Sequence, residues 1–394
     1  MKKYMKRIID EVLIEELEAF GGVLIAGPKW CGKTTSASQL AKSSLFMHDE
    51  DNRENNIQMA KIKPSILLKG ENPRLIDEWQ IAPELWDAIR FDIDKKGKEG
   101  LFILTGSTIV DEGKIMHSGA GRISRLLMRT MSLYESGNSN GIISLSELFK
   151  GKEDISAQTD IDIEDMANIL VRGGWPNSVG KKTKVAIRQI SGYCDSIVNS
   201  EVKTVDGVNR DPNKTRNILR VFSRHISTQA TYTTMLNDLK SNNETMNINT
   251  VKNYIDALEK LYVIEDLPAW SPKLRSKTAI RTSPTRHFID PAIAARMLDA
   301  YPEDLLHDLN TFGLLFESLV IRDLRIYSQL LNGQVYHYRD KTNLEVDAVI
   351  HLDNGEWAAV EVKLGSSQID TAAENLLKFS EKVDLKKGPS FLAI

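Results

Sequence analysis

The sequence has only two cysteines, Cys31 and Cys194, and they lie far apart in unrelated contexts. Two isolated cysteines provide neither a disulfide framework nor a cysteine-based metal cluster. Cys31 lies inside a glycine-rich loop, where a free thiol suits a reducing compartment. The sequence therefore argues against a disulfide-stapled secreted protein, and we expect a soluble protein of the cytoplasm.

Long apolar runs and an excess of one charge are lacking as well. No stretch approaches the ~18 consecutive apolar residues of a membrane span, and residues 1–11 are charged rather than signal-like. Lysine plus arginine number 51 and aspartate plus glutamate 54, so no global positive field indicates a nucleic-acid partner. We expect no membrane partner, and any contact with DNA has to be local. The 394 residues suffice for several domains.

What the sequence does contain is the phosphate-binding pattern G-x-x-x-x-G-K-[ST] at residues 27–34. An apolar run at 22–26 predicts a buried strand before it, and residues 34–42 predict the first turns of a helix after it. A strand that leads through such a loop into a helix directs several backbone N–H groups at one phosphate. A chance match in an ordinary strand-turn-helix is the alternative. The predicted nucleotide-binding residues are Gly27, Pro28, Lys29, Trp30, Cys31, Gly32, Lys33, Thr34 and Thr35, with ATP and Mg²⁺ as ligands.

A second motif, the apolar strand 73–77, ends in the carboxylates Asp77 and Glu78. In a P-loop protein we expect Asp77 to hold Mg²⁺ together with the Thr34 hydroxyl, and Glu78 to polarise the attacking water. Phosphoryl transfer depends mainly on such positioning and charge stabilisation. Lys33 is expected to reach the β- and γ-phosphates. Taken alone, an Asp-Glu pair is more often a solvated strand end.

Two further positions complete the predicted catalytic set. The strand 101–104 leads into Thr105 and Ser107, one of which is expected to face the γ-phosphate, because ligands bind at the carboxyl ends of parallel strands. The alternative is a merely capped strand end. Arg122 follows a glycine pair and is the candidate arginine finger, acting in cis or from a neighbouring subunit of a homo-oligomer. A solvated surface arginine is the alternative.

The alternation of strands and helices up to about residue 150 predicts a parallel sheet covered on both faces. A helix is expected over 8–20, and strands over 22–27, 44–47, 65–68, 73–77, 101–105 and 126–133. We expect four domains: a P-loop ATPase core over 1–150, a helical lid over 151–205, a winged helix-turn-helix over 206–285 and a further α/β domain over 286–394.

The expected winged helix rests on three apolar helical faces between residues 215 and 261, followed by a short strand pair. Asn249 and Thr250 are expected to cap the helix that would enter a major groove. Its polar face offers Lys252, Asn253 and Lys260. A basic tail follows, with Lys273, Arg275, Lys277 and Arg281. Such modules also serve as protein-packing units, so DNA contact and packing both remain open.

In the last hundred residues a helix over 312–331 bears Glu317, and strands are expected over 335–338, 345–350 and 357–363. Period-two geometry places Glu361 and Lys363 on one strand face, where Asp347 of the neighbouring strand can meet them. Two carboxylates and a lysine, with Glu317 behind them, would bind Mg²⁺ and polarise a water against a phosphodiester. The alternative is a solvated strand face. The apolar run 391–394 reads as a strand cut short, which would leave this sheet without its edge.

With these motifs in place, nearly the whole chain resembles the prokaryotic AAA+-type ATPases that carry a C-terminal domain of PD-(D/E)xK character. The resemblance rests on the P-loop at 27–34, Leu75-Ile76-Asp77-Glu78-Trp79-Gln80 followed by Ala82-Pro83-Glu84-Leu85, Leu104-Thr105-Gly106-Ser107, Ala120-Gly121-Arg122, Gly173-Gly174-Trp175-Pro176, and the set of Phe316-Glu317, Glu345-Val346-Asp347 and Glu361-Val362-Lys363. It implies an AAA+/RecA-like α/β core, a winged-helix module and a restriction-endonuclease-like tail.

Two functions remain open. One is an ATP-driven DNA-processing enzyme whose tail cleaves. The other is a nucleotide-dependent switch or scaffold whose tail binds a partner or nucleic acid without cleaving.

Overall fold

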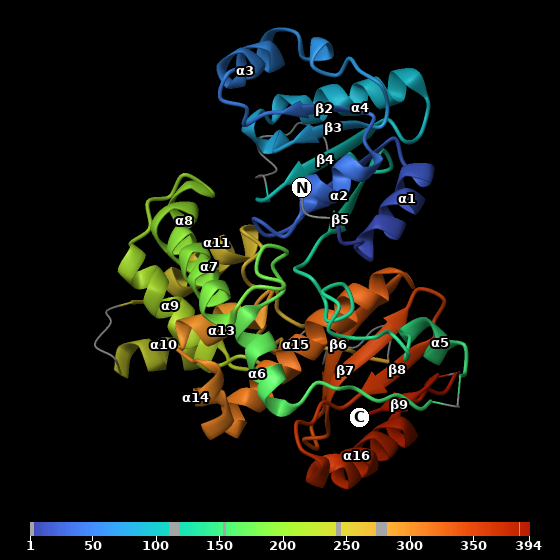
Figure 1. The fold of residues 1–394 in the computed structure, drawn as a ribbon, viewed down its shortest axis with the longest axis vertical. Coiled ribbons are helices and arrows are strands. Elements are labelled where there is room, and N and C mark those ends of the chain that lie inside the picture. Colours follow the sequence, from blue (N-terminus) through green and yellow to red (C-terminus); the bar gives the residue numbers. More distant parts are fainter. Residues whose placement is uncertain (1–3, 110–117, 153–154, 242–245, 273–281, 386) are drawn as a thin grey trace. The chain divides into compact units, whose positions relative to one another are not determined.

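The computed structural model describes residues 4–109, 118–152, 155–241, 246–272, 282–385 and 387–394. The chain forms two compact units (Figure 1). The first contains Met1–Met131 with the short segments Val205–Gly207 and Lys260–Tyr262, and the second contains the rest. The first unit thus ends before the expected boundary at residue 150. The finer division of the second unit into lid, winged helix and tail domain stays a prediction.

A sheet of five parallel strands forms the centre of the first unit, in the order β2-β3-β4-β1-β5. The expected α/β fold with a parallel sheet is therefore confirmed. The inner strands are fully or largely buried because helices cover both faces, as their apolar sequences predict. The strands are β1 (Gly22–Ala26), β2 (Ser43–Phe46), β3 (Arg74–Asp77), β4 (Phe102–Gly106) and β5 (Ile123–Leu127).

Two of the expected strands differ from the structure. Residues 65–68 form no strand, because Pro64–Ile66 is a short 3-10 helix with the proline in its first turn. Leu67 and Leu68 are buried in a core cluster with the sheet and the helix Glu84–Lys96. The strand expected over 126–133 lies earlier, at Ile123–Leu127. Apolar content alone thus predicted burial but not strand conformation.

Four helices pack on the sheet of the first unit: α1 (Ile9–Ala19), α2 (Lys33–Leu40), α3 (Arg53–Ile62) and α4 (Glu84–Lys96). The helix expected over 8–20 corresponds to α1. Trp86, Ile89 and Ile93 of α4 lie in one core cluster with alternate residues of the central strands. Trp79 packs on Trp86 with ring centroids 4.8 Å apart. The carboxyl ends of β1, β3 and β4 are left for the loops that follow them.

In chain order, the second unit begins with α5 (Leu145–Phe149), which packs on residues of the later sheet. A helical part follows, whose elements are α6 (Ile163–Arg172), α7 (Thr183–Ser196), the π-helical turn Ile197–Glu201, α8 (Val202–Thr204), α9 (Pro212–Arg224), α10 (Tyr232–Ser241), α11 (Ile248–Lys260), α13 (Pro291–Met297) and α14 (Pro302–His307). After α11, antiparallel bridges join Ile264 to Phe288 and Leu267 to Thr285. The helices expected over residues 215–261 are thus present as α9, α10 and α11, but the residues that follow form isolated bridges to Thr285 and Phe288, beyond the expected span, and the winged helix stays a prediction. The predicted basic tail of Lys273, Arg275, Lys277 and Arg281 lies outside the described residues.

The expected cap of α11 is wrong, because the capping residue precedes Asn249 and Thr250 in the sequence. Asn247 caps the helix, because its Oδ1 accepts a hydrogen bond of 2.8 Å from the backbone N–H of Thr250. Asn249 and Thr250 lie inside the first turn. Several Asn and Thr residues follow one another here, and each is a good N-cap residue. The sequence therefore predicted the helix start but not which residue caps it.

A four-stranded sheet in the order β6-β7-β8-β9 forms the rest of the second unit. The chain runs through α15 (Leu309–Gln329), β6 (Gly333–Arg339), β7 (Glu345–Leu352), β8 (Trp357–Val360), α16 (Ile369–Lys382) and β9 (Leu392–Ala393). The first three strands are antiparallel neighbours, and β9 pairs in parallel with β8. The expectation that the run 391–394 leaves the sheet without its edge is wrong, since Leu392 and Ala393 form that edge strand.

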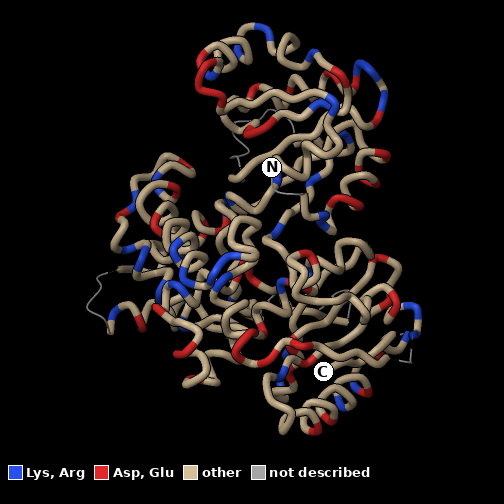
Figure 2. The backbone as a smooth tube through the Cα atoms, in the orientation of Figure 1, with Lys and Arg blue, Asp and Glu red and all other residues tan. Residues whose placement is uncertain are grey.

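The cysteines, the distribution of charge and the polarity of the helices agree with the composition. Cys31 and Cys194 are both free and buried. Positive and negative side chains are interspersed along both units, as the balanced charge count predicts (Figure 2). Within the described part of the chain, every helix is too short or too polar to cross a lipid bilayer.

Candidate functional site

The loop between β1 and α2 has a backbone conformation that requires glycine. Gly27 has a φ of +152°, and a Cβ atom there would lie 2.2 Å from the carbonyl oxygen of Met128. Gly32 has a φ of +107° and is the N-cap of α2, which begins at Lys33. The first N–H groups of a helix have no partner within the helix and attract an anion. The strand, loop and helix start predicted for a phosphate site are therefore present.

Lys33 is buried at the start of α2 and its side chain turns back over the loop. Its Nζ donates hydrogen bonds to the carbonyl oxygens of Gly27 at 3.0 Å and Pro28 at 2.8 Å. Two carbonyl oxygens neutralise an ammonium less well than a phosphate does, so the lysine remains a strong anion ligand. The geometry keeps this charge at the loop.

The other predicted loop residues differ in exposure. Pro28 and Cys31 are buried, Lys29 is half-buried and Thr35 is exposed. The side chain of Trp30 is 59 % exposed, and its φ of +65° is unusual for a residue with a Cβ atom. Trp30 and Thr35 are therefore the predicted loop residues whose side chains face solvent.

Asp77 ends β3 and is only 1 % exposed. Its Oδ1 accepts hydrogen bonds of 2.6 Å from the hydroxyls of Thr34 and Thr105. Its Oδ2 lies 3.3 Å from Nδ1 of His48. The carboxyl ends of neighbouring parallel strands meet at one edge, which brings β3, β4 and the start of α2 together. The structure thus places the predicted magnesium ligands Thr34 and Asp77 in direct contact.

Glu78 follows Asp77 with a φ of +55°, a left-handed conformation that turns its side chain away from the strand direction. Its Oε2 accepts hydrogen bonds from Ser107 Oγ at 3.2 Å and from the amide of Gln80. Its backbone N–H donates to Thr105 Oγ1 at 3.2 Å. We expected one of Thr105 and Ser107 to serve this site. Both hydroxyls contact the acidic pair, Thr105 through Asp77 and Ser107 through Glu78.

Arg122 is the predicted site residue that the structure does not bring to this cluster. It precedes β5, and its carbonyl accepts a hydrogen bond from Gly22, the first residue of β1. It therefore lies at the amino-terminal edge of the parallel sheet, whereas the phosphate loop follows the carboxyl end. Its Nε donates to Asp94 Oδ1 at 2.8 Å. A role in the site of the same chain is not supported by this position.

Three residues of the site were missed in the sequence. His48 follows β2 and contacts Asp77, and Gln80 contacts both Glu78 and, at 3.5 Å, Ser107. Arg7 donates to the carbonyl of Cys31 within the loop. His48 and Arg7 are lone residues of common types outside any motif, whereas Gln80 belongs to the segment 75–80 on which the family resemblance rests, without a role assigned to it there. The one available signal was the position of His48 just after a short predicted strand, because that strand ends at the same edge of the sheet as the strand that ends in Asp77.

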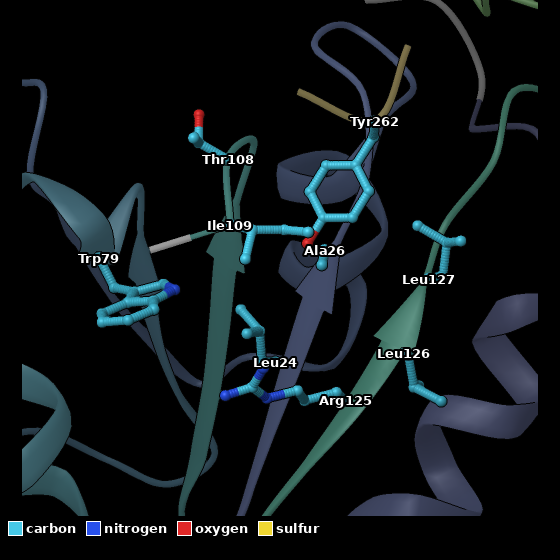
Figure 3. A pocket seen from close by; sticks show the side chains of 9 residues that line it. All are labelled: Leu24, Ala26, Trp79, Thr108, Ile109, Arg125, Leu126, Leu127 and Tyr262. Atoms are coloured by element: carbon cyan, nitrogen blue, oxygen red, sulfur yellow. The ribbon is translucent and has the colours of Figure 1, made fainter. Parts of the chain in front are cut away.

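A pocket of about 150 Å³ lies beside the central strands of the first unit (Figure 3). Its walls are mainly apolar, and the Tyr262 ring lies over Ala26 and Ile109. Arg125 lines it and stacks on Trp86, with the guanidinium carbon 5.4 Å from the ring centroid. None of the predicted phosphate-loop residues lines this pocket. Ala26, Trp79 and Thr108 of its lining directly adjoin Gly27, Glu78 and Ser107 in the sequence, so the pocket borders the candidate site.

A second cluster of charges lies on the sheet of the second unit. Lys363 Nζ contacts Asp347 Oδ2 at 3.0 Å and Glu361 Oε2 at 2.6 Å. The Val362 N–H also donates to Asp347 Oδ2, at 2.7 Å. The strand expected over 357–363 ends earlier, because β8 stops at Val360. Asp347, Glu361 and Lys363 still converge as the sequence predicts, with Asn375 added at 2.7 Å from Glu361 Oε1.

Burial and mutual repulsion change the acidity of this cluster. Burial, with the nearby Asp347 carboxylate, raises the pKa of Glu361 to about 7. Glu317 of α15 feels the same charges, and burial followed by Asp347 raises its pKa well above the usual value. Burial alone would lower the pKa of Lys363, but Asp347 and Glu361 outweigh it and raise the pKa. Glu317 thus belongs electrostatically to the cluster, and Lys363 stays charged.

The donor sets fit Mg²⁺ to different degrees. Over the described ranges, no group of three or more His, Cys, Asp or Glu side chains could hold a metal ion. Mg²⁺ does not need such a cage, since it usually takes one or two protein oxygens together with substrate phosphates and water. The Thr34 hydroxyl and the Asp77 carboxylate are oxygens of this kind. In the second cluster the Lys363 ammonium lies between the two carboxylates, so a metal there stays a prediction.

The helix expected to enter a major groove has a mixed exposed face. Asn249, Lys252 and Asn253 are exposed, but so is Asp256, and Lys260 is half-buried. An aspartate beside a single exposed lysine weakens attraction to phosphates. DNA contact by α11 stays a prediction.

Comparison with known proteins divides the chain into three matched parts. Residues 20–137 match an AAA domain, residues 163–304 match a domain of unknown function (DUF8612), and residues 312–392 match another (DUF4143). Among solved structures, the Walker-type ATPase PABY2304 of Pyrococcus abyssi is similar at 14 % identity and a TM-score of 0.44, covering 73 % of this chain and 94 % of that one. No curated protein matches the chain. Residues 20–137 are thus similar to an AAA domain.

Proposed function

We propose that the first unit binds and hydrolyses ATP with Mg²⁺. The observation that carries this proposal is the contact of Thr34 and Asp77, 2.6 Å apart, beside a glycine-shaped loop that holds Lys33. The match of residues 20–137 to an AAA domain supports it. These groups form one constellation at the carboxyl edge of a parallel sheet, where α/β folds bind ligands.

Each residue has a role that follows from its position. The N–H groups of the loop and the Lys33 ammonium bind the phosphates, and Thr34 with Asp77 provides oxygen ligands for Mg²⁺. When bound, this ion neutralises charge on the transferred phosphoryl group. Glu78 orients the attacking water and accepts its proton, after its carboxylate is released from Gln80 or Ser107. Thr105 holds Asp77 in place.

Two variants test the assignment. Lys33→Ala is expected to weaken ATP binding, whereas Glu78→Gln is expected to bind ATP normally and lower turnover by about 100-fold or more. Lys69→Ala, at an exposed lysine of the same unit, is the matched control. Turnover that is unchanged in either test variant would overturn the assignment. Binding is measured with a fluorescent nucleotide and turnover by phosphate release.

We also propose that the cluster of Glu317, Asp347, Glu361 and Lys363 acts on phosphodiesters, with DNA as the substrate and ATP turnover driving its action. The convergence of one lysine and two carboxylates supports this proposal. A charged lysine can stabilise the negative charge that develops on the phosphate in the transition state, while a carboxylate positions the attacking water. The three helices and antiparallel pair of residues 212–289 support a nucleic-acid partner. The second unit would then be a nuclease-like module whose action is driven by ATP turnover in the first unit.

Cleavage assays separate this proposal from the switch or scaffold. Supercoiled DNA, linear DNA and RNA are incubated with Mg²⁺ or Mn²⁺, using wild type, Asp347→Asn and Lys363→Met. The proposal predicts cuts that both variants lose. Intact substrates throughout would favour a nucleotide-dependent switch whose second unit only binds. Stimulation of ATP turnover by double-stranded DNA is the accompanying measurement of their coupling.

A further inference from the structure

The segment before α1 reaches the phosphate loop through a buried arginine. Arg7 is 4 % exposed, and its Nη1 donates to the carbonyl oxygen of Cys31 at 2.8 Å. Its Nη2 donates to the carbonyl oxygen of Arg129 at 2.9 Å. One guanidinium thus joins the loop after β1 to the segment after β5. Because its donors form a rigid fork, the distance between the two carbonyls is fixed as well.

Arg7 is itself held in place. Its backbone N–H donates to Asp10 Oδ2 at 2.8 Å. Tyr4 donates to the same carboxylate at 2.7 Å, and its hydroxyl lies 2.8 Å from Ser36 Oγ in the first turn of α2. The segment before α1 therefore contacts the loop at Cys31, through Arg7, and the first turn of α2 at Ser36, through Tyr4. Such mutual hydrogen bonds reduce the freedom of every member.

The consequence for the loop follows from the geometry of the peptide bond. In a planar trans peptide the carbonyl of one residue and the N–H of the next point in opposite directions. Cys31 lies between two left-handed residues, Trp30 with a φ of +65° and Gly32 with a φ of +107°. Holding the Cys31 carbonyl on Arg7 therefore directs the Gly32 N–H to the other side of the loop. The loop also packs on Met128, whose carbonyl accepts from Cys31 Sγ at 3.4 Å.

We propose that Arg7 is a positioning residue for the phosphate site: it acts through Cys31 and orients the loop amides that bind the β-phosphate of the nucleotide. This inference rests on the proposed ATP site. The proposed role of Arg7 differs from a purely structural role, because it requires that nucleotide affinity depends on Arg7 even in fully folded molecules. A preorganised loop binds its ligand without first paying the entropy of ordering.

The test compares Arg7→Met and Arg7→Lys with Lys6→Met, a neighbouring position whose ammonium makes an exposed ion pair with Glu11. Dissociation constants for ADP and ATP are measured with fluorescent analogues at a temperature well below each variant's melting point. Arg7→Met is expected to weaken both nucleotides by about tenfold or more, by equal factors, while kcat at saturation changes by less than about threefold. Arg7→Lys cannot bridge both carbonyls with a fork, and its nucleotide affinity is expected to lie between those of wild type and Arg7→Met.

The outcomes are distinct. If Arg7→Met does not fold, Tyr4→Phe provides the second variant, since it removes the contact with Ser36 and is expected to weaken ADP by a few-fold. Unchanged affinity in the folded Arg7 or Tyr4 variants, with a lower melting temperature only, would overturn the inference and leave the ATP site standing. A wild-type protein that binds neither nucleotide would instead refute the proposed function. Loss of affinity in Lys6→Met as well would show a general effect of the segment and also overturn the inference.

Discussion

The hydroxyl of Thr34 and the carboxylate of Asp77 are joined by a hydrogen bond of 2.6 Å, although 43 positions separate them in the sequence. The same oxygen of Asp77 also accepts from Thr105. Three segments that follow different strands therefore meet at one carboxylate. The contact keeps the two oxygens that we propose as Mg²⁺ ligands adjacent in a buried setting, where electrostatic interactions are stronger than in water.

From this contact we predict that Asp77→Asn preserves the fold but not catalysis. The amide keeps an acceptor for Thr34 and Thr105, but it lacks the negative charge that Mg²⁺ requires. Turnover is expected to fall by about 100-fold or more, while ADP affinity measured in EDTA stays within about twofold of wild type. Asp94→Asn, at an exposed aspartate, is the control. Normal Mg²⁺-dependent turnover in Asp77→Asn would contradict the assignment.

A second prediction concerns Arg122. Because this arginine lies at the amino-terminal edge of the sheet and pairs with Asp94, we expect that it does not act on the site of its own chain. Arg122→Ala is therefore expected to keep the turnover of dilute protein within about twofold of wild type. A large loss at every protein concentration would show that Arg122 acts in cis. A loss seen only in concentrated protein would identify action on a neighbouring copy.

The sequence predicted the phosphate loop and the acidic pair because both are local patterns whose strands must end at one edge of a parallel sheet. It also predicted that Asp347, Glu361 and Lys363 meet, although the expected reason, alternation along one strand, does not apply because β8 stops at Val360. It could not predict the contacts of His48, Gln80 or Arg7, because these contacts depend on three-dimensional neighbours, and Gln80 stood in the sequence only as a member of the segment 75–80. The apolar residues 65–68 were misassigned to a strand, since burial and strand conformation share the same composition.

The Gly-Gly-Trp-Pro segment provides a third prediction. Gly173 has a φ of +70°, and a Cβ atom there would lie 2.9 Å from the Ala292 Cβ and 3.1 Å from Asp290 Oδ1. Gly180 has a similar φ of +73° but open space around it. Both alanine variants carry the backbone cost of about 1 kcal/mol, and Gly173→Ala adds about 1–3 kcal/mol of overpacking. Urea denaturation followed by tryptophan fluorescence measures the difference, and equal losses in the two variants would contradict it.

The fourth prediction concerns the pH dependence of stability. His337 in β6 is 2 % exposed, and burial, with a contribution from nearby Arg339, lowers its pKa to about 4. An unfolded histidine has a pKa of about 6.5, so between these values the unfolded chain binds the proton and the folded chain does not. The neutral side chain therefore favours the folded state above about pH 6.5, and this stability is lost as the pH falls toward 4.

The size of the effect follows from the difference between the two pKa values. A shift of this size corresponds to roughly 3 kcal/mol, lost progressively between about pH 6.5 and pH 4. His337→Gln is expected to be less stable at pH 7, because the buried site is altered, but its free energy of unfolding should change less steeply over this range. His307→Gln, at an exposed histidine, is the matched control. Chemical denaturation at several pH values measures the slope, and parallel pH profiles for wild type and His337→Gln would show that His337 does not titrate in this way.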